Sequence, residues 1–249
     1  MNTPFSLEGK RILVTGASSG IGRAIAIGCS QMGADIVLTG RDELRLFETM
    51  ESLHQGQHQM LMADLTNENE REKLINDLSQ PIDGCVHSAG ISKLSPFRMM
   101  TEDHLMEIMS INVIAPMLLT QALLKKQKIQ NKGSILFISS IAAHVGVQGV
   151  GGYSGSKAAV IGMMRCLALE VVKRKIRVNS LSPALVKTPL FGTFESQSGA
   201  TTMERIQSDY PLGFGEPEDI ANASIFFLSE ASRWITGTSL VMDGGLTIS

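Results

Sequence analysis

A phenol and an ammonium group stand one helical turn apart in this sequence, at Tyr153 and Lys157. Side chains four residues apart on a helix lie on the same face, so the two groups are neighbours. An adjacent cation favours the phenolate and draws the pKa of the phenol from about 10 towards working pH, where the group can give or take a proton. Tyr153 is therefore a candidate general acid and base.

A serine hydroxyl is expected beside these two groups. Ser140 follows a predicted strand over residues 134–139 and precedes Tyr153 by thirteen residues. Open parallel α/β sheets bind ligands beyond the carboxyl ends of their strands. Ser140 can therefore hydrogen-bond the same substrate oxygen to which Tyr153 gives its proton, and hold that oxygen for attack.

A glycine-rich loop, Thr15-Gly16-Ala17-Ser18-Ser19-Gly20-Ile21-Gly22, lies between the first predicted strand and the first predicted helix. Gly16 permits a tight turn, Gly20 lets the backbone approach a pyrophosphate, and Gly22 lets the helix pack on the strand. The N-terminus of the helix faces the negative charge of the phosphates. The loop therefore predicts a dinucleotide site, with contacts from Gly16, Ser18, Ser19, Gly20, Ile21 and Gly22.

These groups must be positioned by a parallel sheet. Short apolar runs rich in β-branched residues alternate with segments whose apolar residues recur at helical spacing, a pattern that implies parallel strand pairing. We expect an α/β fold in which a single domain, residues 1–249, forms a doubly wound Rossmann sheet of seven parallel strands with helices on both faces. The predicted strands cover residues 11–15, 36–39, 60–63, 82–87, 134–139, 177–181 and 239–242. The predicted helices cover residues 21–32, 43–53, 68–78, 117–125, 152–173 and 217–228.

One long irregular segment, at about residues 188–217, interrupts this alternation. Connections of that length in a compact α/β domain are usually functional, and this one combines glycines with the apolar residues Phe191, Phe194 and Met203. We expect a substrate lid that excludes water from the reacting group. Its amides from Gly192 to Met203 should exchange quickly in the free protein and slowly with ligand.

The end of the second predicted strand bears on whether the dinucleotide carries a 2′-phosphate. An acidic side chain there would accept hydrogen bonds from an unphosphorylated adenosine ribose, but the residues are Thr39-Gly40-Arg41. Arg41 offers a planar cation suited to a phosphate. NADP is therefore favoured over NAD. The alternative is that Arg41 merely faces solvent before Asp42.

Four motifs together resemble those of the short-chain dehydrogenase/reductase family. They are the spacing Gly16-x-x-x-Gly20-x-Gly22, the asparagine Asn112 in a long helix, Ser140 with Tyr153-x-x-x-Lys157, and the C-terminal run from Gly237 to Gly245. The resemblance extends from about Leu7 to Gly245. It is nearest to the 3-oxoacyl-carrier-protein reductases and their relatives that act on ketones, sugars and steroids.

The resemblance implies further contacts with the cofactor. Lys157 holds the nicotinamide ribose hydroxyls, Asp64 bonds the adenine amine and Thr188 contacts the carboxamide. Asn112 supports a water chain that returns protons from solvent. An alternative role for Asp64 is to cap the helix that follows it. The remaining cofactor positions are Leu65, Ser88, Ala89, Gly90, Pro183 and Val186, together with Tyr153.

Three positions depart from the family pattern. His87-Ser88-Ala89-Gly90 stands where many relatives have Asn-Asn-Ala-Gly. We expect ribose binding to persist there with changed hydrogen bonds, and we interpret His87 as structural rather than as a base. Pro183-Ala184 replaces Pro-Gly, and the added methyl is expected to crowd the nicotinamide ring or the pocket. Phe214 stands where an arginine is common, which makes that surface less cationic.

The expected function is an NADP(H)-dependent oxidoreductase that reduces a ketone to a secondary alcohol by hydride transfer, with Tyr153 as general acid and base. The substrate is a small carbonyl or alcohol. Thioesters of 3-oxoacyl groups on an acyl carrier protein are one candidate class, for which Arg174 matches a basic family position while Asn131 and Phe214 supply no further arginine. The alternatives are an NAD-dependent dehydrogenase of a sugar, steroid or other cyclic alcohol, and a protein that binds NADP without turnover. A sugar epimerase or dehydratase is disfavoured by the few residues after the last predicted strand.

Composition limits the partners. A formal net charge of −2 over 249 residues offers no long-range field for nucleic acid or an anionic membrane, and we expect neither as a partner. No run approaches the roughly 20 apolar residues of a membrane span, no signal peptide and no metal site is expected, and the expected location is cytoplasmic. Cys29, Cys85 and Cys166 are expected to be buried, reduced thiols. Apolar stripes on the two long helices around Asn112 and Tyr153 favour a homotetramer.

Overall fold

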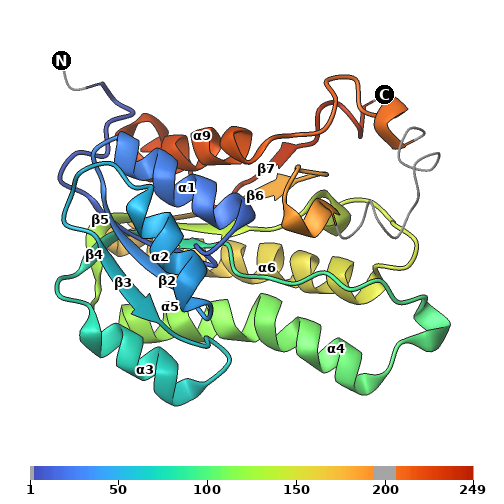
Figure 1. Ribbon diagram of the computed structural model, residues 1–249, viewed down its shortest axis with the longest axis horizontal. Coiled ribbons are helices and arrows are strands. Elements are labelled where there is room, and N and C mark those ends of the chain that lie inside the picture. The colour runs from blue at the N-terminus through green and yellow to red at the C-terminus, as the bar shows by residue number, and fades with distance from the viewer. Residues whose placement is uncertain (1–2, 193–205, 249) are drawn as a thin grey trace.

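One parallel sheet of seven strands organises the residues that the computed structural model describes, 3–192 and 206–248 (Figure 1). The strands are β1 Arg11–Thr15, β2 Asp35–Gly40, β3 Gln59–Met62, β4 Ile82–His87, β5 Ile129–Ile138, β6 Arg177–Pro183 and β7 Ser239–Met242. Their order across the sheet is β3-β2-β1-β4-β5-β6-β7, and every neighbouring pair is parallel. The predicted Rossmann sheet of seven strands is therefore confirmed.

The strand order reverses between β1 and β4, because the chain builds β2 and β3 on one side of β1 and the later strands on the other. In such a sheet, the connections that leave the carboxyl ends of the two central strands diverge to opposite faces. A crevice for a ligand is expected where they part.

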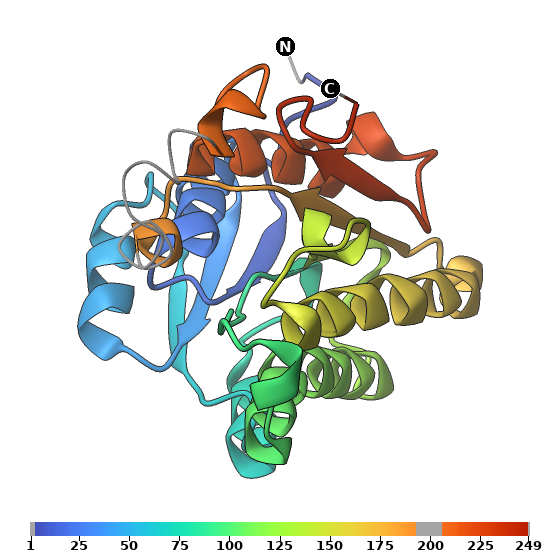
Figure 2. The same ribbon diagram turned by 90° about the vertical axis from the view of Figure 1, so that its right-hand side faces the viewer.

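Helices cover both faces of the sheet. In Figure 2 the blue and red helices form the layer on one face, and the green and yellow helices form the layer on the other. Each face has its own core, because alternate residues of a strand point to opposite faces. In β1, Leu13 belongs to one core and Val14 to the other, and both are fully buried. Burial on both faces explains why the strands are continuous apolar runs. The first layer holds α1 Gly20–Gln31, α2 Glu43–Glu51 and α9 Pro217–Leu228, and the second holds α3 Glu68–Asp77, α4 Glu102–Met109, α5 Ala115–Lys125 and α6 Gly151–Glu170.

α4 and α5 form one continuous helix over Glu102–Lys125, joined by a π-helical turn at Ser110–Ile114. By length and hydropathy this helix is long and apolar enough to cross a membrane, which corrects the expectation that no segment would be. The apolar residues Val113, Leu119 and Leu123 are buried against the sheet. Packing in the core therefore accounts for part of the apolar composition of the helix, while Met106, Ile114 and Leu118 stay exposed.

β5 begins at Ile129 rather than at residue 134 as predicted. Ile129 pairs with Ile82 of β4, and the chain then bulges outward before Ser134 resumes the pairing opposite Gly84. Lys132 in the bulge has a φ of 66°, a left-handed conformation that is uncommon for lysine. The apolar pattern begins only where regular pairing resumes, and for this reason it missed the start of the strand.

The three cysteines do not share one environment. Cys29 and Cys85 are buried, as expected, and burial raises the pKa of Cys29 to about 12. Cys166 is exposed, so the expectation that all three thiols are buried is wrong. The neighbouring residue Met164 takes the position on α6 that faces the core.

His87, the last residue of β4, is a buried core residue. Its ring stacks on that of Phe137, with centroids 4.7 Å apart and an interplanar angle of 13°, and its Nε2 lies 2.8 Å from the hydroxyl oxygen of Thr120 on α5. Burial lowers the pKa of His87 to about 3. The imidazole is thus neutral at physiological pH and joins the sheet to the helix layer, which supports its structural interpretation.

The pKa of His87 predicts a specific loss of stability in mild acid. The folded-state pKa is about 3 and the ordinary value is 6.5, so the unfolded chain takes up the proton first and stability falls as pH drops below about 6.5. Between pH 7.5 and 5, above the ordinary carboxyl range, the loss from this residue should be about 2 kcal/mol. We expect His87→Asn to show a smaller loss over this interval in urea unfolding.

His54→Asn, the same substitution at an exposed histidine, is the matched control and should keep the loss that burial of His87 causes. Equal losses for the unmodified protein and His87→Asn between pH 7.5 and 5 would show that His87 is not the source.

Candidate functional site

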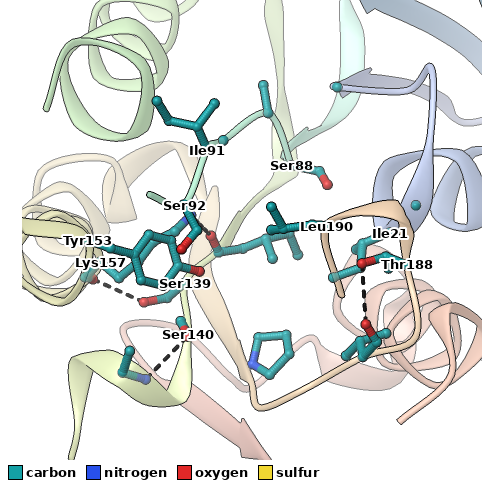
Figure 3. Close-up of a pocket in the computed structure, with 18 of the residues that line it drawn as sticks. Ile21, Ser88, Ile91, Ser92, Ser139, Ser140, Tyr153, Lys157, Thr188 and Leu190 are labelled. Carbon is teal, nitrogen blue, oxygen red and sulfur yellow. Dashed lines mark hydrogen bonds between the residues drawn. The ribbon is translucent and has the colours of Figure 1, made fainter. Parts of the chain in front are cut away.

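A cleft of about 990 Å³ opens at the carboxyl ends of the strands, where the loops after β1 and β4 part. Every residue that was expected to bind the cofactor lines this cleft, and so do Ser140, Tyr153 and Lys157 (Figure 3). Asn112 is the one predicted site residue that does not line it. The structure therefore brings together residues that the sequence separates by more than a hundred positions.

Tyr153 and Lys157 come from the first turns of α6, and Ser140 follows β5 (Figure 3). The hydroxyls of Tyr153 and Ser140 share a hydrogen bond, and Lys157 Nζ lies 5.6 Å from the centre of the Tyr153 ring. Lys157 Nζ donates to the carbonyl of Ile138 at 2.9 Å, and the carbonyl of Lys157 accepts from Ser139 Oγ at 3.0 Å. The three side chains therefore form one preformed group on the wall of the cleft.

The protonation of this group differs from the expectation. Burial raises the pKa of Tyr153 above its ordinary value of 10, and the hydrogen bond with Ser140 offsets part of the rise. Burial also lowers the pKa of Lys157 to about 8. Desolvation therefore dominates the pKa of Tyr153, which corrects the predicted direction of its shift. At neutral pH the phenol carries its proton and is ready to act as an acid.

Asn112 lies in the π-helical turn and binds protein rather than facing the cleft. Its Nδ2 donates to the carbonyl of Ile91 at 2.9 Å and to Ser156 Oγ at 3.0 Å, while its Oδ1 accepts from the N–H of Ile91 at 2.9 Å. A Cβ added at Gly90 would lie 3.2 Å from Asn112 Oδ1 and 3.3 Å from Lys157 Nζ. The asparagine side chain thus fixes the loop after β4 against α6.

Thr15, the last residue of β1, is a site residue whose role sequence reasoning missed. Its hydroxyl accepts hydrogen bonds from the N–H groups of Ser88 and Ala89, both at 3.1 Å. The bonds hold the loop after β4 beside the glycine-rich loop. The available signal was the hydroxyl of Thr15 at the end of β1. That this hydroxyl contacts the loop after β4 follows only from the strand order, which places β1 beside β4.

The glycine-rich loop and the first turn of α1 form a cradle that fits a pyrophosphate. Gly16 has a φ of 65°, and a Cβ there would approach the backbone of Ala89 to 2.8 Å. A Cβ at Gly22 would come within 2.3 Å of the carbonyl oxygen of Gly16. Ser19 makes no side-chain cap and the first turn of α1 contains no acidic residue. The free N–H groups of the helix N-terminus are therefore open to an anion.

Arg41 and Asp64 line the cleft just beyond the ends of β2 and β3, with Arg41 Nη1 and Asp64 Oδ2 3.8 Å apart. Asp64 Oδ1 accepts from the backbone N–H and the hydroxyl of Thr66, and these bonds lower the pKa of Asp64. Asn67 caps α3, so Asp64 is not the helix cap that was its alternative role. The guanidinium of Arg41 is largely exposed, so a phosphate can reach it from solvent.

The wall opposite α6 is built by the chain after β6. Ala184 donates from its N–H to the carbonyl of Met242 at 2.9 Å, and Gly215 donates to the carbonyl of Leu185 at 3.0 Å. Ala184 lines the cleft together with Thr188. This wall is therefore tied to β7 and to the chain that returns after residue 206.

Phe214 has a role that the sequence did not indicate. Its ring packs edge-on against Phe191 at 5.2 Å and against Tyr210 at 5.0 Å between centroids. The cluster of Phe191, Tyr210 and Phe214 therefore joins the chain before residue 193 to the chain after residue 206. Residues 193–205, with Phe194 and Met203 among them, lie outside the described part of the chain, so the substrate lid stays a prediction.

Comparison with known protein sequences identifies clear relatives. The family described as enoyl-(acyl carrier protein) reductase matches residues 16–247. The 3-oxoacyl-[acyl-carrier-protein] reductase of Rickettsia bellii is 34% identical over 243 residues, which are 97% of this chain and 98% of that protein. The 5-keto-D-gluconate 5-reductase of Escherichia coli K12 is 29% identical and covers both chains fully.

A solved structure shows the same architecture. A protein from Beutenbergia cavernae, described as an NAD(P)-dependent gluconate 5-dehydrogenase with NADP bound at low occupancy, superposes with a TM-score of 0.89. It is 30% identical and covers 99% of this chain and 100% of its own. The similarity thus includes the whole sheet and both helix layers.

Proposed function

Because the chain belongs to the short-chain dehydrogenase/reductase family and is an oxidoreductase acting on CH–OH and C=O groups, we propose that it reduces a ketone to a secondary alcohol with NADPH. One observation carries the proposal: Ser140, Tyr153 and Lys157 meet in the cleft that also contains the glycine-lined anion cradle. A hydride donor and a proton donor can therefore reach the same carbonyl.

The residues act on the two ends of the carbonyl bond. When bound, the cofactor supplies the hydride that the carbonyl carbon accepts. The hydroxyls of Ser140 and Tyr153 hydrogen-bond the carbonyl oxygen, and Tyr153 gives its proton to that oxygen as negative charge develops there. Because burial raises the pKa of Tyr153, the phenol is protonated at neutral pH, and this state favours reduction. Lys157 stabilises the phenolate that remains.

Arg41 supports the choice of NADPH. It lines the cleft just beyond the end of β2, with no carboxylate in the sequence position that would bind an unphosphorylated ribose. The structural neighbour from Beutenbergia cavernae holds NADP. The Asp64 carboxylate lies close enough to orient the Arg41 guanidinium. A 2′-phosphate would compete with Asp64 for the N–H groups of Arg41.

The structure weakens one argument for a substrate bound to an acyl carrier protein. Arg174, the basic residue expected to face the carrier, hydrogen-bonds Asn131 Oδ1 at 3.0 Å and the carbonyl of Ile129. Its guanidinium thus holds the start of β5, and an acidic partner would have to compete with these bonds. We therefore keep acyl-carrier-bound thioesters as one candidate among ketone substrates.

We also propose a homotetramer of single-domain subunits in the cytoplasm. Apolar side chains remain exposed on the outer faces of α5 and α6, among them Leu118 at 41%, Met163 at 45% and Leu169 at 77%. These faces lie on the same side of the molecule, beyond the core that covers the sheet. Association of copies through them would remove this surface from water.

Tyr153→Phe should lower kcat by about a hundredfold to ten-thousandfold, because it removes the proton donor and keeps the ring. NADPH affinity should stay within a few fold.

Lys157→Ala should lower both kcat and NADPH affinity, since the ammonium serves both. Steady-state rates and fluorescence titration of NADPH measure these effects.

Tyr210→Phe is the matched control for Tyr153→Phe, because Tyr210 also borders the cleft but its hydroxyl is directed to the backbone of Leu185. It should keep most of the activity. Substantial turnover by Tyr153→Phe would remove Tyr153 from the proposed role.

Arg41→Ala should cost about 1 to 3 kcal/mol of the preference for NADPH over NADH, through loss of charge-assisted hydrogen bonds to the 2′-phosphate. The ratio of the two dissociation constants measures it. Arg45→Ala on the neighbouring helix α2, outside the cleft, should leave the ratio unchanged. Equal affinities for the two cofactors in the unmodified protein would contradict the proposal.

Light scattering at micromolar concentration should report four subunits, and Met163→Asp should reduce the assembly by placing a charge in the proposed contact. Leu44→Asp, at an exposed apolar residue of α2, is the control and should not change the mass. A monomeric unmodified protein would overturn the tetramer.

A further inference from the structure

Apolar side chains from three separate segments line one part of the cleft, with polar residues such as Ser92 and His104 also in the lining. The segments are the loop after β4, the chain between Ser140 and α6, and the chain after Thr188. Figure 3 shows Leu190 between the group around Tyr153 and Thr188. The apolar side chains from these segments are Leu94, Val145, Val147, Val150, Leu190 and Phe191.

Contacts hold two of these segments to each other and the third to the chain around Phe214. Ser95 donates from its N–H to the carbonyl of Gly149 at 2.7 Å, which joins the loop after β4 to the chain before α6. A Cβ at Gly149 would lie 3.7 Å from a methyl group of Leu94. Phe191 is held by Phe214. The apolar part of the cleft is therefore already formed.

Three of these apolar side chains are unusually open to solvent. Leu94 is 46% exposed, Val147 is 47% exposed and Leu190 is 50% exposed. Apolar surface that lines a concave site is the usual environment of an apolar ligand group. A substrate chain that covers these three residues gains the free energy of removing both surfaces from water.

Charged groups around the cleft do not favour a substrate carboxylate. Lys93 is paired with Glu107, and Arg41 lies beyond the end of β2, at the proposed adenosine site. Lys157 donates to a backbone carbonyl beside the reacting hydroxyls. Asp209 adds a carboxyl group to the lining. No lysine or arginine of the described lining is thus placed to bind an acid group in the apolar part.

We propose that the substrate is an uncharged ketone whose apolar chain lies against Leu94, Val147 and Leu190, and that keto acids of sugars are poor substrates. The inference rests on the proposed ketone reduction and adds to it the class of substrate. It separates this chain from the 5-keto-D-gluconate 5-reductase to which it is similar, because that substrate carries a carboxylate and several hydroxyls.

The test is a homologous series of methyl 3-oxoalkanoates, from 3-oxobutanoate to 3-oxoheptanoate, with 5-keto-D-gluconate as the polar comparison. Each methylene removed from water contributes about 0.8 kcal/mol, so kcat/KM should rise about fourfold per added methylene until the apolar part is filled. The rate with 5-keto-D-gluconate should be lower than that of every ester in the series. NADPH absorbance follows all the reactions.

Variants test the residues directly. Val147→Ser and Leu94→Ser should each flatten the dependence of kcat/KM on chain length, while the smallest ester loses little. Leu44→Ser is the matched control, since Leu44 is 78% exposed on α2 and lies outside the cleft. It should keep the full dependence on chain length. Val147→Arg should raise the relative rate with 5-keto-D-gluconate by supplying a cation.

The outcomes distinguish the two proposals. A flat dependence on chain length in the unmodified protein, or faster reduction of 5-keto-D-gluconate than of the esters, would overturn the apolar substrate and leave ketone reduction standing. The same dependence in Val147→Ser, Leu94→Ser and the unmodified protein would also overturn it. Reduction of neither class, despite tight NADPH binding, would refute the proposed function and this inference with it.

Discussion

The position of the reacting groups depends on the hydrogen bonds of one buried amide. Asn112 joins three segments that are distant in sequence: the π-helical turn between α4 and α5, the backbone of Ile91 after β4, and Ser156 of α6. Ser156 lies between Tyr153 and Lys157 on the same helix. The amide therefore fixes the phenol and the ammonium relative to the loop that borders the cleft. Since its oxygen and nitrogen both have partners in a buried site, it has one favoured orientation, and the proton donor is positioned by the fold before any ligand arrives.

Burial of Tyr153 and Lys157 helps the proposed chemistry but lowers the stability of the fold. Desolvation favours the neutral form of each, so Tyr153 keeps its proton and the pKa of Lys157 falls to about 8. The unfolded chain holds the lysine proton up to its ordinary pKa of 10.5. Burial of the ammonium therefore opposes folding below about pH 8, and this penalty is relieved as the pH rises from 8 to 10.5. The burial that keeps the proton on Tyr153 thus also destabilises the fold through Lys157.

Local patterns predicted the strands, most of the helices and the glycine-rich loop, because apolar periodicity and glycine spacing are properties of neighbouring residues. The resemblance to the family added further residues that line the cleft. What the local patterns missed depends on distant contacts. The pKa direction of Tyr153 follows from how deeply α6 is covered, which its spacing to Lys157 does not reveal. Thr15 binds the loop after β4 only because those strands are neighbours. Phe214 was read as a lost charge, whereas it is packed between two rings from other parts of the chain.

The aromatic cluster of Phe191, Phe214 and Tyr210 has a consequence for how such a protein can evolve. It joins the chain before residue 193 to the chain after residue 206. Leu190, which lines the cleft, directly precedes Phe191. Replacements among the three rings can therefore shift this side of the cleft without touching Ser140 or Tyr153. Related chains can diverge in substrate in this way while they keep the sheet and the reacting hydroxyls.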